Sequence, residues 1–316
     1  MDARSSESPR GVFAAALTPL NHSLEPDTAL FVAHCRWLLD HGCDGVVPIG
    51  TTGEGNSLSV KQRLGLIEAA AGSGLPMAKF IIGSGSCALA DAVEVTRAAV
   101  GAGAAGVLVL PPFYYKEPSE DGLFAFFSEV IQRVGDNRLR VYLYHFPQLS
   151  TVPITAPLIG RLMATYPETV VGLKDSSGDW SYSANLLKEF PGLGVFTGSE
   201  QFLLANLRAG GVGCISANVN ITAPLAHAVF QAWRGGDADR LQKELDDTRV
   251  ALQDYPFPAA HKHLMSVISG NPEWINMLPP NRPLAAQRVR ELIERLGALA
   301  SMKPILGGSA GRESKR

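Results

Sequence analysis

Short apolar runs alternate with longer amphipathic segments along most of the chain. The runs are continuously hydrophobic, which is typical of strands covered on both faces, and the segments between them have helical period. The apolar runs cover residues 12–17, 44–49, 77–83, 105–110, 139–145, 169–174, 193–197 and 212–216. The amphipathic segments cover residues 27–40, 59–71, 89–100, 120–134, 156–166, 180–190, 201–208 and 223–233. The pattern therefore predicts eight successive strand–helix pairs.

Pairs of this kind with short connections predict parallel strands, because each return must cross over through a helix. A parallel sheet can stay open and doubly wound, or it can close into a barrel. Eight units in roughly 225 residues favour the barrel, whose usual size is about 250 residues. We therefore expect an α/β fold with a TIM (β/α)8 barrel, and we keep the open sheet as the alternative.

The pattern changes after the eighth pair. Residues 237–253, 259–269 and 283–296 have helical period, and no apolar run of strand length lies between them. Proline-rich segments at 256–258 and 279–280 separate these stretches, since proline cannot continue a helix interior. The sequence thus predicts a C-terminal three-helix extension of the barrel.

Both ends of the chain are poor in apolar residues, so we expect them to lie outside the core. The predicted organisation is a disordered N-terminal tail at 1–10, the barrel at 11–235, the helical extension at 236–300 and a loose tail at 301–316.

Composition narrows the class of partner. The 316 residues are 46% hydrophobic and carry a net charge of −2, which argues against nucleic acid or a membrane as the main partner, because both would require a basic face. The four cysteines are scattered, and the polar first ten residues do not resemble a signal peptide. We expect a cytoplasmic protein with reduced thiols.

Lys174 ends the sixth apolar run, VVGLKD at 170–175. A lysine at the end of a buried strand loses hydration, which disfavours its ammonium form. The neutral amine can then attack a ketone and form a Schiff base. The alternative is a lysine that reaches solvent or pairs with Asp175 or Glu200.

Strand alternation gives Lys174 two expected neighbours. Gly172 shares its face, and we expect this glycine to leave room for the methylene stem of the lysine. Tyr144 ends the fifth run, so its phenol is expected to enter the same barrel mouth. Asp175 faces the other way and is expected to be a structural partner.

The turn after the second run is Gly50-Thr51-Thr52-Gly53-Glu54. Its backbone amides can converge on a carboxylate, with threonine hydroxyls beside them. A plain threonine-capped turn is the alternative for this motif alone.

Two other motifs predict no cofactor or metal site. GAGAAG at 101–106 matches a dinucleotide fingerprint in spacing, but it follows a helix and precedes a strand, which is the wrong order. His261-Lys262-His263 lies in a predicted helix, where residues two apart do not share a face, so we predict no metal there.

The GTTGE turn, the tyrosine ending the fifth strand and the GLKD ending the sixth together resemble the dihydrodipicolinate synthase / N-acetylneuraminate lyase family. These are class I, Schiff-base-forming pyruvate aldolases on a TIM barrel, and the similarity runs over about residues 11–296. The resemblance implies Lys174 as the Schiff-base lysine and Tyr144 as the proton shuttle. It also implies Thr51 as the hydroxyl relay, and Thr51 with Thr52 as the turn that binds the keto-acid carboxylate. No metal or organic cofactor is expected, since the covalent imine forms on Lys174.

The resemblance assigns further residues around the site. An aromatic residue from a neighbouring subunit completes the family's relay, and the loop PPFYYK at 111–116 supplies Tyr114 for this role, with Tyr115 as the alternative. The implied assembly is a homotetramer, built as a dimer of dimers. The carbonyl of Ile215 is expected to face the catalytic phenol. Ser176, Gly198 and Glu200 are expected near the polyhydroxy tail of a sugar-acid substrate.

Two positions depart from the lysine-pathway synthases. Their arginine for the second substrate's carboxylate corresponds to Leu149, which cannot replace a bidentate guanidinium. His145 stands where the family usually has asparagine, and it can either bind an unusual substrate or only pack.

The predicted function is cleavage or condensation of a 2-keto acid to pyruvate plus an aldehyde, on a 2-keto-3-deoxy or sialate-like sugar acid. The alternatives are a sugar-acid dehydratase, a dihydrodipicolinate synthase, which Leu149 disfavours, and a non-catalytic barrel that binds a keto acid. Sialic acids, 2-keto-3-deoxy sugar acids, 4-hydroxy-2-oxoglutarate and aromatic aldehydes all remain open as the source of the aldehyde part.

Overall fold

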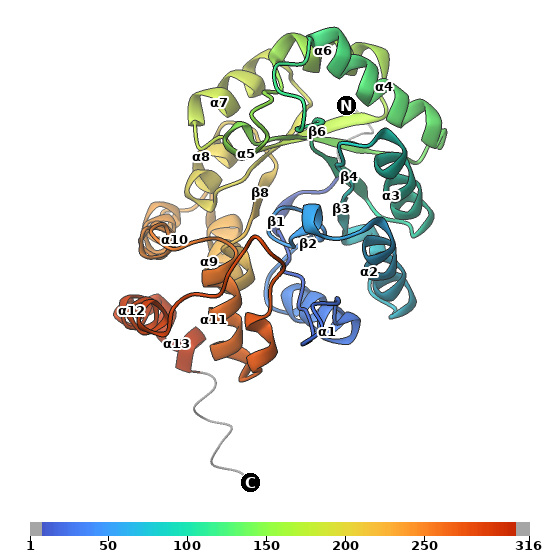
Figure 1. Cartoon of the computed structure of the whole chain (residues 1–316). Coiled ribbons are helices and arrows are strands. Elements are labelled where there is room, and N and C mark those ends of the chain that lie inside the picture. The colour runs from blue at the N-terminus through green and yellow to red at the C-terminus, as the bar shows by residue number, and fades with distance from the viewer. Residues whose placement is uncertain (1–7, 308–316) are drawn as a thin grey trace.

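Eight parallel strands form a ring at the centre of the molecule, and helices surround it (Figure 1). The structure is a computed structural model that describes residues 8–307. The strands are β1 Gly11–Ala14, β2 Gly45–Val46, β3 Ile81–Gly83, β4 Gly106–Val109, β5 Val141–His145, β6 Val170–Asp175, β7 Gly194–Thr197 and β8 Gly213–Ser216. Their order is β2-β1-β8-β7-β6-β5-β4-β3, and a parallel bridge between Val46 and Phe80 joins the two ends. The predicted TIM barrel is confirmed, and the open sheet is excluded.

The helices of the barrel follow the strands in sequence. They are α1 Thr28–Asp40, α2 Val60–Gly72, α3 Leu89–Gly101, α4 Glu120–Val134, α5 Pro147–Ser150, α6 Ala156–Thr165, α7 Trp180–Glu189, α8 Leu203–Arg208 and α9 Val219–Ala232. Short 3-10 turns lie at η1 Gly55–Ser57, η2 Met77–Lys79 and η3 Glu200–Phe202. Several helices begin where a side-chain oxygen accepts a hydrogen bond from the first turn, for example Asp27 for α1 and Ser59 for α2. Within residues 8–307, no helix is both long and apolar enough to cross a membrane.

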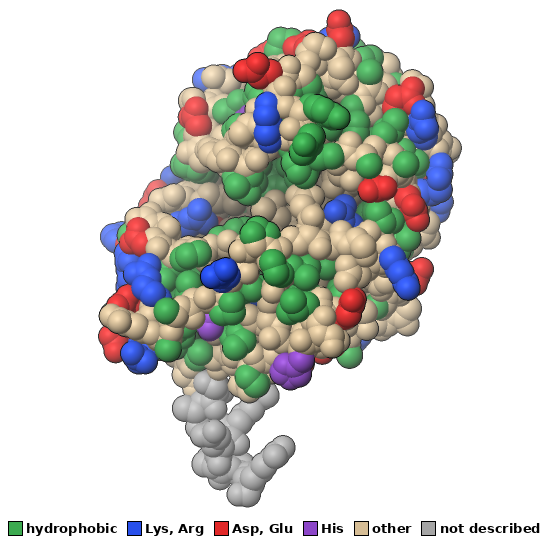
Figure 2. Space-filling model, in the orientation of Figure 1, with side chains coloured by type: hydrophobic (Ala, Val, Ile, Leu, Met, Phe, Trp, Pro, Cys, Tyr) green, Lys and Arg blue, Asp and Glu red, His purple; other side chains and the backbone are tan. Residues whose placement is uncertain are grey.

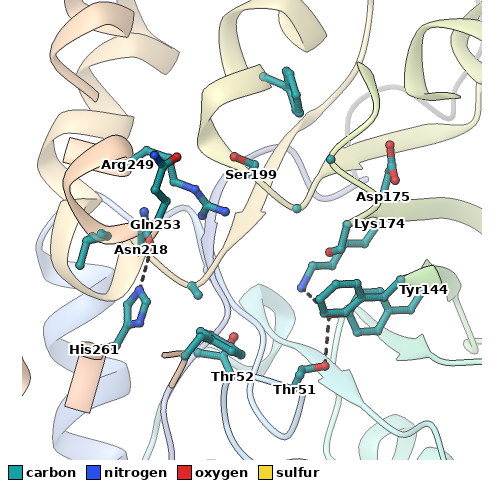
Figure 3. Close-up of a pocket in the computed structure, with 18 of the residues that line it drawn as sticks. Thr51, Thr52, Tyr144, Lys174, Asp175, Ser199, Asn218, Arg249, Gln253 and His261 are labelled. Carbon is teal, nitrogen blue, oxygen red and sulfur yellow. Dashed lines mark hydrogen bonds between the residues drawn. The ribbon is translucent and has the colours of Figure 1, made fainter. Parts of the chain in front are cut away.

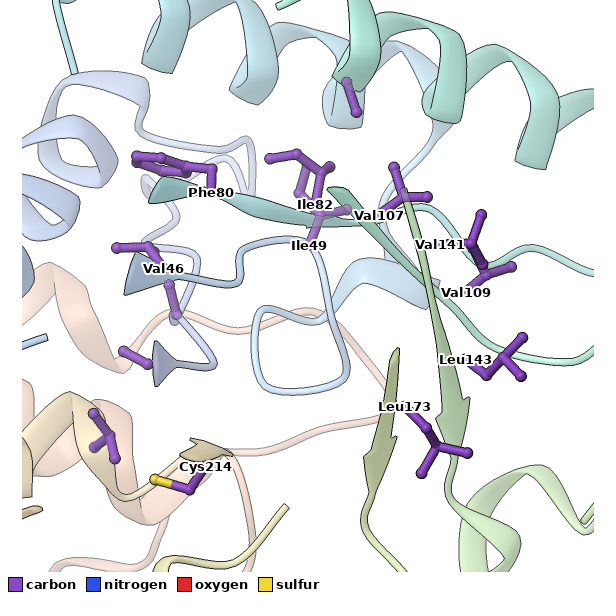
Figure 4. Close-up of a cluster of buried hydrophobic side chains, with 14 of the residues drawn as sticks. Val46, Ile49, Phe80, Ile82, Val107, Val109, Val141, Leu143, Leu173 and Cys214 are labelled. Atoms are coloured by element: carbon purple, nitrogen blue, oxygen red, sulfur yellow. The ribbon is translucent and has the colours of Figure 1, made fainter. Parts of the chain in front are cut away.

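Apolar side chains fill two layers on either side of the strands. The outer layer lies between the barrel and its helices, as Figure 4 shows for Val141, Leu143 and Leu173. The inner layer fills the barrel itself and includes Phe13, Ile81, Leu108, Tyr142, Tyr144, Phe196 and Ile215. Alternate residues of β5 therefore enter different layers, as a strand's period of two requires.

Gly172 serves a different neighbour from the one expected. A Cβ atom at this position would lie 2.4 Å from the ring of Tyr142 and 2.6 Å from the carbonyl oxygen of Gly194. The glycine therefore makes room for an aromatic ring inside the barrel, and the expectation that it accommodates the stem of Lys174 is wrong. Alternation predicts the face correctly but does not reveal which ring on the next strand fills the space.

The C-terminal extension packs against the barrel near α9 (Figure 1). It contains α10 Ala238–Leu252, α11 Ala259–Ser269, η4 Pro272–Ile275, α12 Ala286–Gly297, η5 Ala300–Met302 and α13 Lys303–Gly307. Its apolar side chains form one cluster with Leu17 and Ile221 of the barrel. The three predicted helices are therefore present and share a core with the barrel.

Residues 301–307, the first part of the expected loose tail, are helical. Residues 300–307 form η5 and α13, and the Met302 side chain is completely buried in the cluster of the extension. Met302, with Leu299, Ile305 and Leu306 packed against the same cluster, holds this segment in place. The expected tails at 1–7 and 308–316 lie outside the described residues.

Replacing Gly172 with alanine should lower the free energy of unfolding by about 1–3 kcal/mol, because the added methyl group overlaps the Tyr142 ring. Gly65, inside α2, is the matched control, since a Cβ there has no heavy atom within 4 Å. Gly65→Ala should raise the unfolding free energy by about 0.5–1 kcal/mol. Urea titrations measure both values, and equal stabilities for the two variants would contradict this account of the inner core.

Candidate active site

Lys174 and Tyr144 lie side by side at the carboxyl ends of β6 and β5. The parallel register pairs these two residues directly, and both side chains belong to the inner face. Lys174 Nζ lies 3.4 Å from the Tyr144 hydroxyl and 4.4 Å from the centroid of its ring. The lysine side chain is buried, with 5% of the residue exposed. An amine and a phenol are thus held together with little access to bulk water.

Thr51 extends this pair on its other side. Its hydroxyl lies 3.3 Å from the Tyr144 hydroxyl, so lysine, tyrosine and threonine form one line of hydrogen-bonding groups (Figure 3). The turn that carries Thr51 requires a glycine at position 53, since a Cβ there would lie 2.8 Å from the carbonyl oxygen of Ala16. Glu54 ends the turn in the left-handed region, with φ of 54°.

A cavity of about 280 Å³ opens above this line of groups, and Figure 2 shows the same face hollowed near its middle. The barrel contributes Thr51, Thr52, Tyr144, Phe146, Lys174, Asp175, Ser176, Gly178, Gly198, Ser199, Phe202, Ala217 and Asn218 to its lining. The extension contributes Arg249, Leu252, Gln253, Tyr255, Phe257 and His261. The cavity therefore has one wall of reactive and small polar groups and a facing wall from the extension.

Most of the residues expected at the site line this cavity. Besides the reactive groups, Thr52, Ser176 and Gly198 all do so. Tyr114 does not, because 72% of it is exposed on the surface, where its ring packs edge-on against Tyr115. The side chain of Ile215 packs in the inner core of the barrel and is not part of the cavity lining.

Glu200 is turned away from the cavity, contrary to the expectation that it lies near a substrate tail. It is completely buried and accepts hydrogen bonds from the Ser216 hydroxyl and, at 2.6 Å, from Asn218 Nδ2. Arg249 provides the nearest cation, 3.8 Å from its Oε2. The reason is local, since Glu200 begins η3, which directs its side chain inward instead of towards the mouth of the barrel.

His261 completes this buried network from the extension. Its Nε2 lies 2.7 Å from Asn218 Oδ1, and since the amide nitrogen of Asn218 donates to Glu200, the histidine nitrogen has to donate here. Burial, assisted by the charge of Arg249, lowers the pKa of His261 to about 3. The histidine is therefore neutral at physiological pH, and it fixes Asn218 at the edge of the cavity.

His145 and Asp175 follow Tyr144 and Lys174 at the strand ends, and their side chains are bonded to other parts of the barrel, although Asp175 also borders the cavity. His145 Nδ1 accepts the Ile154 N–H at 3.1 Å, and its ring stacks on Tyr182. Burial lowers the pKa of His145, against the opposing effect of Asp175. The Asp175 carboxylate accepts from Ser177 N–H and from the Ser183 hydroxyl. His145 therefore packs and does not reach the cavity, and Asp175 has the structural role expected of it.

The wall from the extension was not identified from the sequence. Arg249 and Leu252 of α10 and Gln253, the residue that caps it, have spacing i, i+3, i+4, which places them on one helix face. That spacing was the available signal, but nothing local indicates that this face is directed at the barrel mouth. Among residues 8–307, no group of three or more His, Cys, Asp or Glu side chains is arranged to hold a metal ion.

Comparison with known proteins identifies extensive similarity. Residues 8–298 match the model of the Dihydrodipicolinate synthetase family. The chain is 38% identical over 286 residues to a protein of Chloroflexus aurantiacus named "Uncharacterized DapA-like lyase". The matched region covers 90% of this chain and 95% of that protein. It is 31% identical over 301 residues to the 4-hydroxy-tetrahydrodipicolinate synthase of Acidiphilium cryptum, covering 92% and 99% of the two chains.

Solved structures are similar over the same range. The dihydrodipicolinate synthase of Agrobacterium tumefaciens superposes with a TM-score of 0.85 at 32% identity, covering 92% of this chain and all of that one (100%). YagE, a prophage protein from E. coli K12 that belongs to the dihydrodipicolinic acid synthase family, was solved in complex with pyruvate. It gives a TM-score of 0.83 at 27% identity, with 92% and 98% covered.

The low pKa of His261 predicts a loss of stability in acid. In the unfolded chain the histidine takes up a proton below its ordinary pKa of 6.5, whereas in the folded protein it does so only near pH 3. The free energy of unfolding therefore decreases as the pH is lowered from 6.5 towards 3. From about pH 7 to about pH 5 the protonation of His261 in the unfolded chain should cost about 2 kcal/mol of unfolding free energy. His261→Gln keeps a donor for Asn218 but does not titrate. Between the same two pH values its free energy of unfolding should therefore fall by about 2 kcal/mol less than that of the wild-type protein. Urea titrations at both pH values measure the difference, and identical pH dependence in the two proteins would refute the assignment.

Proposed function

The chain belongs to the dihydrodipicolinate synthetase family of class I pyruvate-dependent lyases, and we propose that it breaks or forms the C3–C4 bond of a 2-keto acid through an imine on Lys174. The products of cleavage are pyruvate and an aldehyde. One observation carries the proposal: the buried Lys174 amine lies 3.4 Å from the Tyr144 phenol, which lies 3.3 Å from the Thr51 hydroxyl. An amine, a proton carrier and a relay are what imine chemistry requires.

The first step is condensation of Lys174 with the C2 ketone. The neutral amine attacks the carbonyl carbon, and the carbinolamine loses water once Tyr144 supplies a proton to the departing hydroxyl group. A protonated imine remains. The carboxylate of the keto acid binds to the amides and hydroxyls of Thr51 and Thr52, which line the same cavity as Lys174. This contact sets the carbonyl carbon within reach of the amine.

The second step uses the imine as an electron sink. Tyr144, relayed by Thr51, removes the proton from the C4 hydroxyl, and the electrons of the C3–C4 bond move to the imine nitrogen. The products of this step are an aldehyde and an enamine. Protonation of C3 and hydrolysis of the imine then release pyruvate and restore Lys174. A positioned proton carrier of this kind contributes about 10²–10⁴ in rate, and no step requires a metal or an organic cofactor.

The substrate class that we propose is a sugar acid, either a 2-keto-3-deoxy acid or a sialate-like acid. The support is the set of small polar side chains on the cavity wall beside Lys174, among them Ser176 and Ser199, which can bind hydroxyl groups. Leu149 is apolar and lies outside the cavity lining, so this position provides no cation for the carboxylate of a second substrate. This favours a sugar acid over the substrate of the lysine-pathway synthases.

We further propose that the protein works as a cytoplasmic homotetramer, a dimer of dimers in which a neighbouring subunit donates Tyr114. The support is the exposure of Tyr114 and Tyr115, at 72% and 78%, since two adjacent exposed rings are typical of an interface. The four free cysteines are compatible with a reducing compartment.

Borohydride reduction in the presence of pyruvate should add a reduced pyruvyl group to the peptide that contains Lys174, as mass spectrometry would show. Lys174→Ala should give no adduct and no turnover. Tyr144→Phe should fold normally and lose about 10²–10⁴ in kcat, because the proton carrier is gone. A Lys174→Ala protein that still released pyruvate would falsify the mechanism.

The substrate class is tested by a pyruvate-release screen over a panel of 2-keto-3-deoxy acids and sialic acids. Release of pyruvate from at least one sugar acid is the expected result. A product with an unchanged number of carbon atoms would instead identify a dehydratase. Pyruvate that binds but is never trapped by borohydride would identify a non-catalytic barrel.

The proposed subunit contact predicts complementation. Tyr114→Phe should lower kcat by about 10-fold through loss of the relay hydroxyl, while Tyr115→Phe, the matched control, should not. Mixed oligomers of Tyr114→Phe and Lys174→Ala should regain activity, because a site with Lys174 then receives Tyr114 from the other subunit. No recovery in mixed oligomers would exclude a donated tyrosine.

A further inference from the structure

Two adjacent residues of α11 are tied to opposite sides of the cavity. His261 bonds to Asn218, which follows β8, whereas Lys262 bonds to Glu54, the last residue of the threonine turn after β2. Adjacent helix residues point in different directions, so one helical turn reaches both places. The proposed reaction gives no role to Lys262 or Glu54, although both side chains are completely buried.

Lys262 and Glu54 form an ion pair, and each also makes a hydrogen bond to the backbone of the extension. Lys262 Nζ lies 2.5 Å from Glu54 Oε1 and donates to the carbonyl oxygen of Asn276 at 2.6 Å. Glu54 Oε2 accepts the backbone N–H of Leu278 at 2.7 Å, with Asn281 Nδ2 at 3.5 Å. Burial lowers the pKa of Lys262 from its ordinary value, and the carboxylate of Glu54 opposes that shift.

A buried ion pair of this kind contributes little net stability, because burying two charges is costly. Removing an ion from water costs several kcal/mol, and apolar side chains of similar size often give equal or greater stability. A buried pair does, however, hold its two partners in one defined geometry, because alternative positions leave a charge unsolvated. The pair is therefore better suited to fixing a backbone position than to stabilising the fold.

The backbone that this pair fixes is the threonine turn. The N–H of Glu54 donates to the carbonyl oxygen of Thr51 at 3.1 Å, and the N–H of Gly55 donates to that of Gly50 at 3.0 Å. Glu54 itself has φ of 54°, a region that a glutamate adopts only when its surroundings hold it there. Its side-chain anchors in the extension provide that hold.

We infer that Lys262 is a positioning residue, which acts through Glu54 to hold Thr51 and Thr52 in the geometry that receives the carboxylate of the keto acid. This inference rests on the proposed function. Lys262 does not line the cavity, so it acts only through the threonine turn. Because that turn binds the carboxylate, Lys262 affects how strongly the site prefers ketones that carry a neighbouring carboxylate. The helical extension thus contributes to keto-acid recognition on a barrel turn.

The test compares borohydride trapping of pyruvate with trapping of acetone, which has the ketone but no carboxylate. Wild-type protein should be trapped at far lower pyruvate than acetone concentrations. In the double variant Glu54→Gln/Lys262→Met, which leaves no buried charge unpaired, the preference for pyruvate should fall by about 10-fold to 100-fold, as expected for a misplaced binding group. Trapping by acetone should change much less, because acetone has no carboxylate to position and both Lys174 and Tyr144 are untouched. General destabilisation would lower both reactions together.

Two further variants keep the inference falsifiable. Glu54→Asp retains both charges but withdraws the carboxylate by one methylene, and it should also lose preference for pyruvate. His263→Ala is the control on the same helix, since His263 Nε2 accepts the Leu284 N–H, and it should lower the melting temperature without changing the preference.

The outcomes separate this inference from the function on which it rests. A double variant or a Glu54→Asp protein with wild-type preference would overturn the positioning role and leave the lyase proposal intact. Failure of Glu54→Asp to fold would assign the ion pair to stability alone, which also overturns it. Wild-type protein that neither pyruvate nor acetone can label would refute the lyase proposal itself.

Discussion

The register between β5 and β6 is the constraint on which the site depends. It pairs Tyr144 with Lys174 on the inner face of the barrel, so a phenol and an amine meet where neither is well hydrated. A shift by one residue would direct the lysine to the outer layer, among the apolar side chains beneath the helices. The packing of Tyr142 over Gly172 on the same two strands opposes such a shift.

The C-terminal extension turns an open barrel mouth into a cavity. Its side chains form the facing wall, and the first turn of α11 is anchored both to Asn218 and to Glu54. These contacts join the end of the chain to turns that follow β2 and β8. The extension is therefore part of the site, and its position affects the reactive wall as well as the space available to a substrate.

Much of the fold and the centre of the site could be predicted from the sequence. Eight apolar runs with helical segments between them predict the barrel, and strand alternation places Tyr144 and Lys174 at one mouth. The family resemblance is confirmed by the match over residues 8–298. Local patterns failed where contacts between distant segments decide, as at Gly172, which accommodates a ring from β5. Glu200 follows a strand end as expected, but a 3-10 turn directs it into a buried network. The wall from α10 depends on how the extension docks, which helical period alone does not specify.

The central claim is that the Lys174 nitrogen becomes covalently bonded to C2 of a keto acid. Nuclear magnetic resonance of protein labelled with ¹⁵N at the lysine side chains and mixed with [2-¹³C]pyruvate tests that bond most directly. The account predicts one imine carbon signal that is coupled to a single nitrogen and is absent in Lys174→Ala. A bound carbon that remains a ketone or its hydrate, with no coupling to nitrogen, would contradict it.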